Sequence, residues 1–135
     1  MNITFVILLL LDYRKDVASM GKEDIVEKLK NICDEYSDII GRVILFGSYS
    51  RGEENSDSDI DLYIEPVSIE MTTAKLGANK RYKEFKYALY ERFSTEFDLL
   101  AYGGKRDIES MKRSPLWQQI SKDGIVIYDQ GTKTV

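Results

Sequence analysis

Two aspartates separated by one residue constrain the possible folds of this chain more than any other feature. Asp59 and Asp61 alternate with apolar residues in the run Asp-Ile-Asp-Leu-Tyr-Ile, a pattern that predicts a β-strand over 59–65. Side chains at positions i and i+2 leave the same face of a strand, so both carboxylates are expected close together. Like charges at this spacing repel, and a divalent cation between them removes the repulsion. Carboxylate oxygens with open positions suit Mg²⁺, which keeps its other sites for water and substrate phosphate.

A glycine–serine turn precedes this pair, with ten residues between Ser48 and Asp59. Gly47 follows the apolar run 42–46, whose composition predicts a central strand buried on both faces. Glycine lets backbone N–H groups approach an anion, so the turn is expected to contact phosphate. The Ser48 hydroxyl could contact phosphate, cap a short helix over 49–51, or do both. Arg51 could reach a triphosphate or only brace the acidic loop that follows it. A carboxylate pair beside a phosphate-binding turn indicates phosphoryl or nucleotidyl transfer.

The order Gly-Ser, ten residues, Asp-x-Asp resembles that of the polymerase-beta-like nucleotidyltransferases. The pair Arg51-Gly52 and the run Ser-Asp-Ile-Asp-Leu over 58–62 are most similar to the minimal nucleotidyltransferase (MNT) group, many of whose members are antitoxins of HEPN toxins. The resemblance extends over roughly residues 25–128. It implies the fold of that superfamily, an α/β (α+β) fold in which a small mixed β-sheet is flanked by helices. It also implies transfer of AMP from ATP to a hydroxyl.

Nucleotidyl transfer with two Mg²⁺ ions calls for a third carboxylate, because two aspartates cannot easily hold both ions. Asp98 is the candidate, since it stands alone in the apolar run 96–102, where an unpaired charge would be costly. The family places its third acid on a strand after the second helix, which matches Asp98. The alternative is that Asp98 points to solvent from an edge strand. Glu96 and Glu65 are the second choices.

These predictions define one candidate site. Its expected catalytic residues and metal ligands are Asp59, Asp61 and Asp98, and its expected nucleotide-binding residues are Gly47, Ser48 and Arg51. The likeness to MNT antitoxins implies that the acceptor is a tyrosine of a HEPN toxin. Two alternatives stay open: an antitoxin that binds a HEPN partner without chemistry, for which exposed aromatics such as Trp117 would matter most, and transfer to a small molecule or an RNA end.

Composition limits the other functions. The absence of histidine excludes His-based triads and His-ligated zinc. A net charge of −4 gives no footprint for general nucleic-acid binding. Cys33 is the only cysteine, so no internal disulfide forms and a cytoplasmic location is expected. The apolar run Ile3–Leu11 is too short to span a membrane, and no basic region precedes it.

Length and apolar spacing predict one nucleotidyltransferase domain over 21–130, an N-terminal extension over 1–20 and a frayed tail over 131–135. No second substrate-binding domain fits, so another protein or a second copy would complete the cleft. Helices are expected over 22–36, 80–93, 107–112 and 116–122, further strands over 96–102 and 125–128, and a loop or broken helix over 67–79. Gly41 is expected to end the connection between the first helix and the strand over 42–46. The six basic residues between 75 and 92 form either a solvated helix face or a docking surface for ATP phosphates or an acidic partner. The acceptor, the base preference and the oligomeric state stay open.

Overall fold

The computed structural model describes residues 21–131, so the expected N-terminal extension and most of the expected tail lie outside the described residues. The elements follow in the order α2 (Lys22–Glu35), β1 (Ile40–Phe46), α3 (Ser48–Arg51), β2 (Ile60–Pro66), α4 (Thr73–Ala78), α5 (Lys80–Arg92), β3 (Phe97–Ala101), α6 (Lys105–Lys112), α7 (Pro115–Asp123) and β4 (Ile125–Asp129). None of the helices in this part of the chain combines the length and apolar character that a bilayer crossing needs.

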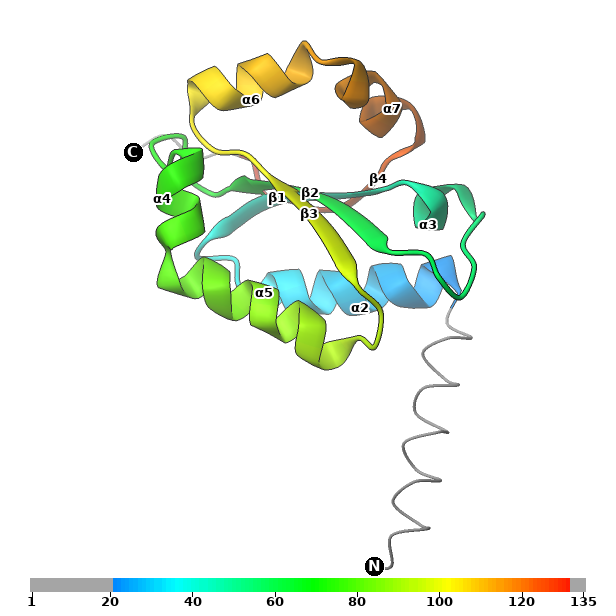
Figure 1. Cartoon of the computed structure of the whole chain (residues 1–135). Coiled ribbons are helices and arrows are strands. Elements are labelled where there is room, and N and C mark those ends of the chain that lie inside the picture. Colours follow the sequence, from blue (N-terminus) through cyan, green and yellow to red (C-terminus); the bar gives the residue numbers. More distant parts are fainter. Residues whose placement is uncertain (1–20, 132–135) are drawn as a thin grey trace, which may run out of the picture.

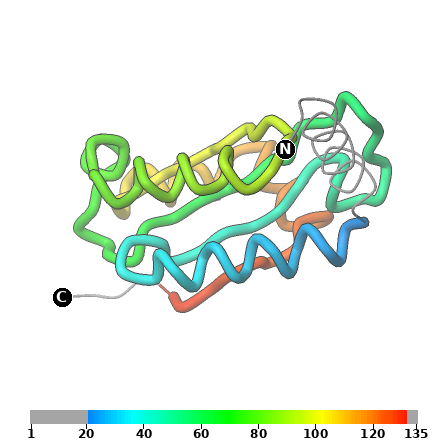
Figure 2. The backbone as a smooth tube through the Cα atoms, turned by 90° about the horizontal axis from the view of Figure 1, so that it is seen from below, coloured from blue at the N-terminus to red at the C-terminus, as the bar shows by residue number. Residues whose placement is uncertain are grey.

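The four strands form one mixed sheet in the order β3-β2-β1-β4. Strand β1 is antiparallel to β2 and β4, whereas β2 and β3 are parallel. Helices α2 and α5 lie below the sheet, and α6 and α7 lie above it (Figure 1). Seen from below, α2 and α5 run side by side under the strands (Figure 2). The predicted α/β (α+β) class with a small mixed sheet and flanking helices is therefore confirmed.

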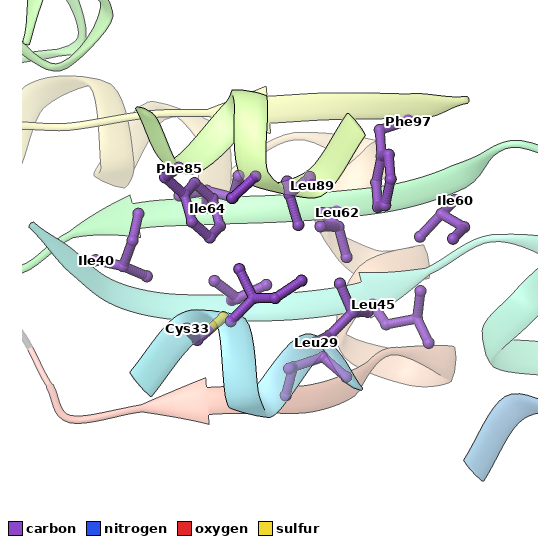
Figure 3. Packing of buried hydrophobic residues seen from close by; sticks show 14 of the residues in the cluster. Leu29, Cys33, Ile40, Leu45, Ile60, Leu62, Ile64, Phe85, Leu89 and Phe97 are labelled. Atoms are coloured by element: carbon purple, nitrogen blue, oxygen red, sulfur yellow. The ribbon is translucent and has the colours of Figure 1, made fainter. Parts of the chain in front are cut away.

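The main core fills the space between the sheet and the pair α2 and α5. The alternating residues of β2 that were predicted to face it, Ile60, Leu62 and Ile64, are each at most 1% exposed. They meet Leu29 and Cys33 of α2 and Phe85 and Leu89 of α5 (Figure 3). Burial raises the pKa of the Cys33 thiol to about 12, as expected of a small apolar core residue.

Two local features differ from or refine the predicted boundaries. Gly41 was expected to end the connection before β1 but lies inside the strand, because its bare Cα faces the β2 backbone; a Cβ there would be 2.5 Å from the Pro66 carbonyl oxygen. The segment 67–79 contains the predicted broken helix. The break between α4 and α5 falls at Asn79, whose side chain accepts a hydrogen bond from the Tyr82 backbone N–H at 3.1 Å.

The packing of α5 against the sheet allows a prediction about stability. Phe85 is fully buried, so Phe85→Ala leaves a cavity and should lower the free energy of unfolding by about 3–5 kcal/mol. Lys83→Ala on the same helix is the control, and we expect it to change stability by less than about 0.5 kcal/mol because Lys83 is exposed. Urea unfolding followed by circular dichroism measures both. Equal losses in the two variants would contradict the assigned packing of α5.

Candidate active site

The parallel pairing of β2 with β3 places two of the predicted acids side by side. Asp61 and Asp98 are register partners, so their side chains leave the same face of neighbouring strands. On its other side Asp61 is the partner of Phe46, the last residue of β1. Asp59 immediately precedes β2. The three predicted carboxylates therefore gather at one end of the sheet, next to the glycine–serine turn that follows β1.

Gly47 makes room for the central carboxylate. Its backbone has φ 77° and ψ −155°, a region that essentially only glycine occupies. A Cβ at this position would lie 2.1 Å from Asp61 Oδ2, so the carboxylate packs directly against the bare Cα. The sequence predicted a phosphate contact for Gly47 but missed this second reason for a glycine, because the contact depends on the pairing of β1 with β2.

Asp61 is affected by its burial and by the neighbouring acids. Burial raises the pKa of the Asp61 carboxyl, and the negative charges of Asp98 and Asp59 raise it further, while Arg51 opposes the shift. The burial argument that singled out Asp98 is wrong, because β3 is an edge strand and Asp98 is exposed. Its charge therefore costs little where it stands. Asp98 therefore faces solvent from an edge strand, as the alternative prediction stated, and it also lies beside Asp61.

The carboxylates of the site suit Mg²⁺ in donor type but not in their present placement. Within residues 21–131, no three His, Cys, Asp or Glu side chains are arranged closely enough to hold a metal ion as they stand. The donor chemistry fits, because the carboxylates supply hard oxygens, and the pKa of Asp61 is raised by burial and by the negative charges of Asp98 and Asp59. Asp59 and Asp98 are exposed, so their carboxylates have room to rotate toward Asp61. The backbone already brings the three acids to one end of the sheet. A cation would therefore be bound once the side chains of Asp59 and Asp98 rotate toward Asp61.

The short helix α3 follows the turn. Gly47, not Ser48, occupies the position before this helix, and Ser48 is its first residue. The alternative that Ser48 caps the helix is therefore wrong. Instead, the Ser50 hydroxyl donates a hydrogen bond to the Gly47 carbonyl at 2.8 Å and ties the turn together. The half-buried Ser48 side chain is not used in capping, and its contact with phosphate stays a prediction.

Arg51 ends α3 and braces the loop that follows. Its Nε donates to Glu53 at 2.9 Å, which raises the pKa of the guanidinium, with smaller contributions from Asp123 and Asp61. The loop-bracing alternative is thus what the structure contains. The influence of Asp61 shows that Arg51 also stands within electrostatic reach of the acids, and a triphosphate contact stays a prediction.

The two second-choice acids have different surroundings. Glu65 is 3% exposed and accepts a hydrogen bond from the Tyr63 hydroxyl at 2.6 Å. It lies four residues along β2 from Asp61, about 13 Å at the rise of a strand, and so belongs to the interior under α6. Glu96 is exposed just before β3 and lines a hollow of about 250 Å³ together with Asp57 and Asp59. Of the two, only Glu96 borders the candidate site.

Trp117 departs from its expected exposure, whereas the basic residues of α5 agree with one of their two predicted roles. Trp117 is half-buried against Tyr63, with ring centroids 5.1 Å apart, so its expected exposure is wrong. The exposed aromatics among residues 21–131 are Tyr87 and Tyr90 of α5. Basic residues of α5 form surface ion pairs, such as that of Arg81 with Asp38, which agrees with a solvated face. Because α5 packs on the sheet face opposite to Asp61, its cations do not serve ATP phosphates at this site.

Comparisons with known proteins agree with this geometry. The family model described as "Polymerase beta, Nucleotidyltransferase" matches residues 27–133. The chain is 40% identical over 78 residues to "Putative protein adenylyltransferase MJ0141" of Methanocaldococcus jannaschii, which covers 58% of this chain and 71% of that protein.

Two solved structures share the fold. A variant of the toxin–antitoxin MntA–HpeT matches with a TM-score of 0.50 and 18% identity, over 82% of this chain and 75% of the matched one. A "putative nucleotidyltransferase from Sulfolobus solfataricus" matches with a TM-score of 0.50 and 19% identity, over 84% of this chain and 88% of the other. At these identities the likeness concerns the fold alone.

Gly47 and Gly52 form a matched pair for testing the turn. Both have positive φ, but an added Cβ meets Asp61 at position 47 and nothing within 4 Å at position 52. Gly52→Ala should cost about 1–2 kcal/mol of stability from backbone strain alone. Gly47→Ala should cost more and should also displace the Asp61 carboxylate. Urea unfolding measures the difference, and equal effects would contradict the packing of Asp61 on the turn.

The raised pKa of Asp61 predicts a pH-dependent gain in stability for Asp61→Asn. A carboxyl whose pKa is higher in the folded state destabilises the fold once ionised, and this penalty disappears as pH falls below that pKa. At pH 7 without divalent cations, the variant should therefore melt at a higher temperature than the unsubstituted chain, and the difference should shrink on acidification. Added Mg²⁺ should raise the melting temperature of the unsubstituted chain more than that of the variant.

The control is Asp57→Asn, which removes one exposed negative charge from the same loop. A melting temperature for Asp61→Asn that falls at pH 7, or rises no more than that of the control, would show that Asp61 is not under strain from its acidic neighbours.

Proposed function

The chain belongs to the polymerase beta nucleotidyltransferase family, and from this membership we propose that it transfers AMP from ATP to a tyrosine of a HEPN toxin partner. The observation that carries the proposal is the pairing of Asp61 with Asp98 against the Gly47 turn. The 40% identical relative named as a protein adenylyltransferase supports both the adenine nucleotide and a protein acceptor. The toxin–antitoxin complex of the same fold supports the antitoxin role.

The proposal gives each residue a role. Asp59, Asp61 and Asp98 would hold two Mg²⁺ ions, which screen the phosphate oxygens and the departing pyrophosphate. The Gly47 turn and the Ser48 hydroxyl would hold the β- and γ-phosphates, with Arg51 beside them. The tyrosine oxygen attacks the α-phosphorus, the bond to the β-phosphate breaks, and pyrophosphate leaves. Asp98, which is exposed beside Asp61, would act as the base for the attacking hydroxyl or as the metal ligand that activates it.

The open position of the site supports an acceptor from another molecule. Asp59 and Asp98 are exposed, and the neighbouring hollow of about 250 Å³ is lined by hydroxyl and acidic side chains rather than by an apolar pocket. A small molecule is normally held in a concave and mostly apolar site. A folded partner can instead bring its own surface to the edge of this sheet. The proposed use of ATP and the buried free thiol of Cys33 support a cytoplasmic location for this reaction.

The test uses the purified chain, its HEPN partner, ATP and Mg²⁺, with the intact mass of the partner as the readout. The partner should gain the mass of AMP on a tyrosine. The double variant Asp59→Asn with Asp61→Asn should reduce the rate by at least about 100-fold, since metal-ion charge stabilisation supplies several kcal/mol. Replacing Mg²⁺ with a chelator should have a similar effect.

The matched control is Asp24→Asn with Asp34→Asn, two exposed carboxylates on α2 far along the chain from the site. It should modify the partner at the normal rate. An unmodified partner in the presence of the folded chain would overturn the proposal. Neutralisation of the toxin in cells by the Asp59→Asn, Asp61→Asn variant would instead favour stoichiometric binding.

A further inference from the structure

Tyr87 is the most exposed large aromatic residue of the described chain. Its side chain lies on α5 and is 68% exposed. It borders a surface hollow of about 420 Å³ whose charged lining is Lys80, Lys83 and Arg92 together with Glu84 and Glu91. Glu84 is already paired with Arg81. Lys83 precedes Tyr87 by one helical turn, so the two side chains share a side of α5. A tyrosine hydroxyl open to solvent, with a lysine one turn before it, is a suitable acceptor for a phosphoryl-containing group.

The other described tyrosines are less suitable. Tyr90 is 51% exposed, but its hydroxyl donates to the Phe97 carbonyl at 3.5 Å and its ring packs on Phe97. The remaining six are buried or half-buried: Tyr36, Tyr49, Tyr63, Tyr82, Tyr102 and Tyr128. Tyr90 is therefore a matched control for Tyr87, because it lies on the same helix and its hydroxyl is already engaged.

The charges of α5 are complementary to those of the candidate site. Arg81 is neutralised by Asp38 and Glu84, whereas no acidic side chain of residues 21–131 pairs with Lys80 or Lys83. At the site, the segment 53–61 contains five acidic residues and no basic one. Opposite charges of this kind steer two molecules together.

A chain cannot bring its own Tyr87 to its own site. Phe85 and Leu89 turn the inner side of α5 to the core below the sheet (Figures 1 and 3). Asp61 alternates with Ile60 and Leu62, which face that core, so it lies on the other face of the strand. Tyr87 projects from the outside of α5, away from both. Any transfer to Tyr87 must therefore come from a second molecule.

We propose that Tyr87 is an acceptor site for AMP transferred in trans by a second copy of this chain, with the lysines of α5 meeting the acidic segment 53–61 of that copy. The inference rests on the proposed adenylyl transfer and adds a second substrate to it. The Tyr87 phenol oxygen forms a bond to the α-phosphorus of ATP, the bond to the β-phosphate breaks, and pyrophosphate leaves. The phenol proton passes to a carboxylate of the site, and Lys80 and Lys83 stand beside the new phosphodiester anion.

The modification would limit itself. Each AMP adds one negative charge next to the lysines that attract the acidic segment. A modified chain is therefore a weaker target for a second encounter while its own site, on the other side of the sheet, stays open. Self-modification would thus regulate contact between copies and leave the chemistry of each copy intact.

The first experiment uses the full chain alone with ATP and Mg²⁺, followed by intact mass and peptide mapping. AMP should appear on Tyr87. Tyr87→Phe should abolish it, and Tyr90→Phe should leave it unchanged. The double reversal Lys80→Glu with Lys83→Glu should slow labelling at least about tenfold, because the encounter loses its attraction. Absence of AMP from the chain, or AMP only at Tyr90 or Tyr13, would overturn the inference.

A mixing experiment tests transfer between copies. The active Tyr87→Phe chain is combined with the Asp59→Asn, Asp61→Asn chain, which keeps Tyr87 and carries a size tag. AMP on the tagged chain supports the inference. If the unsubstituted chain gains AMP in the first experiment but the tagged chain gains none in this mixture, the inference is overturned.

Parallel reactions with the HEPN partner separate the two proposals. A modified partner with an unmodified Tyr87 overturns the self-modification alone. A modified Tyr87 with an unmodified partner supports the self-modification and overturns the HEPN acceptor. If neither is modified, adenylyl transfer to tyrosine is overturned and the self-modification with it.

Discussion

The parallel pairing of β2 with β3 is the constraint on which the site depends, and it is held against an electrostatic cost. Asp61 and Asp98 are forced to be neighbours because Ile60, Leu62 and Ile64 anchor the opposite face of β2 in the core. A slip of one residue would turn that apolar set outward and lose about 1.5–3 kcal/mol for each side chain. The repulsion between partly solvated carboxylates is smaller than this. The core therefore fixes the register, and the register fixes the acids.

Burial along β2 decides which of its acids can bind a ligand. On the site face, exposure falls from Asp59, which is open to solvent, through half-buried Asp61 to Tyr63 and Glu65, which lie under the upper layer. Helices α6 and α7 lie over this face, where Tyr63 packs with Met111 and Ile120 (Figure 1). Glu65 is satisfied by Tyr63 inside this layer. The alternation along β2 thus gives one buried structural acid, Glu65, and two accessible acids, Asp59 and Asp61.

The sequence predicted those parts of the molecule that depend on local pattern. Apolar periodicity indicated the main helices and all four strands, and the alternation in β2 identified the core face correctly. The errors share a cause, since each depends on a distant segment. The exposure of Asp98 follows from the edge position of β3, the place of Gly41 from its contact with Pro66, and the burial of Trp117 from its packing on Tyr63. The position of Ser48 was missed because α3 has only four residues, too few for a periodic signal.

The site is half of a reaction centre. Burial and, after it, the charges of Asp98 and Asp59 raise the pKa of Asp61, and the floor of the site is an open sheet edge instead of an enclosed pocket. Metal ions can offset the negative charge of these acids, but the acceptor must bring its own surface. In the proposed transfer, negative charge that attracts Mg²⁺ would also attract ammonium groups, which would favour tyrosines that lie next to lysines. This preference follows from the charge of the site and holds whether the tyrosine belongs to a partner or to another copy.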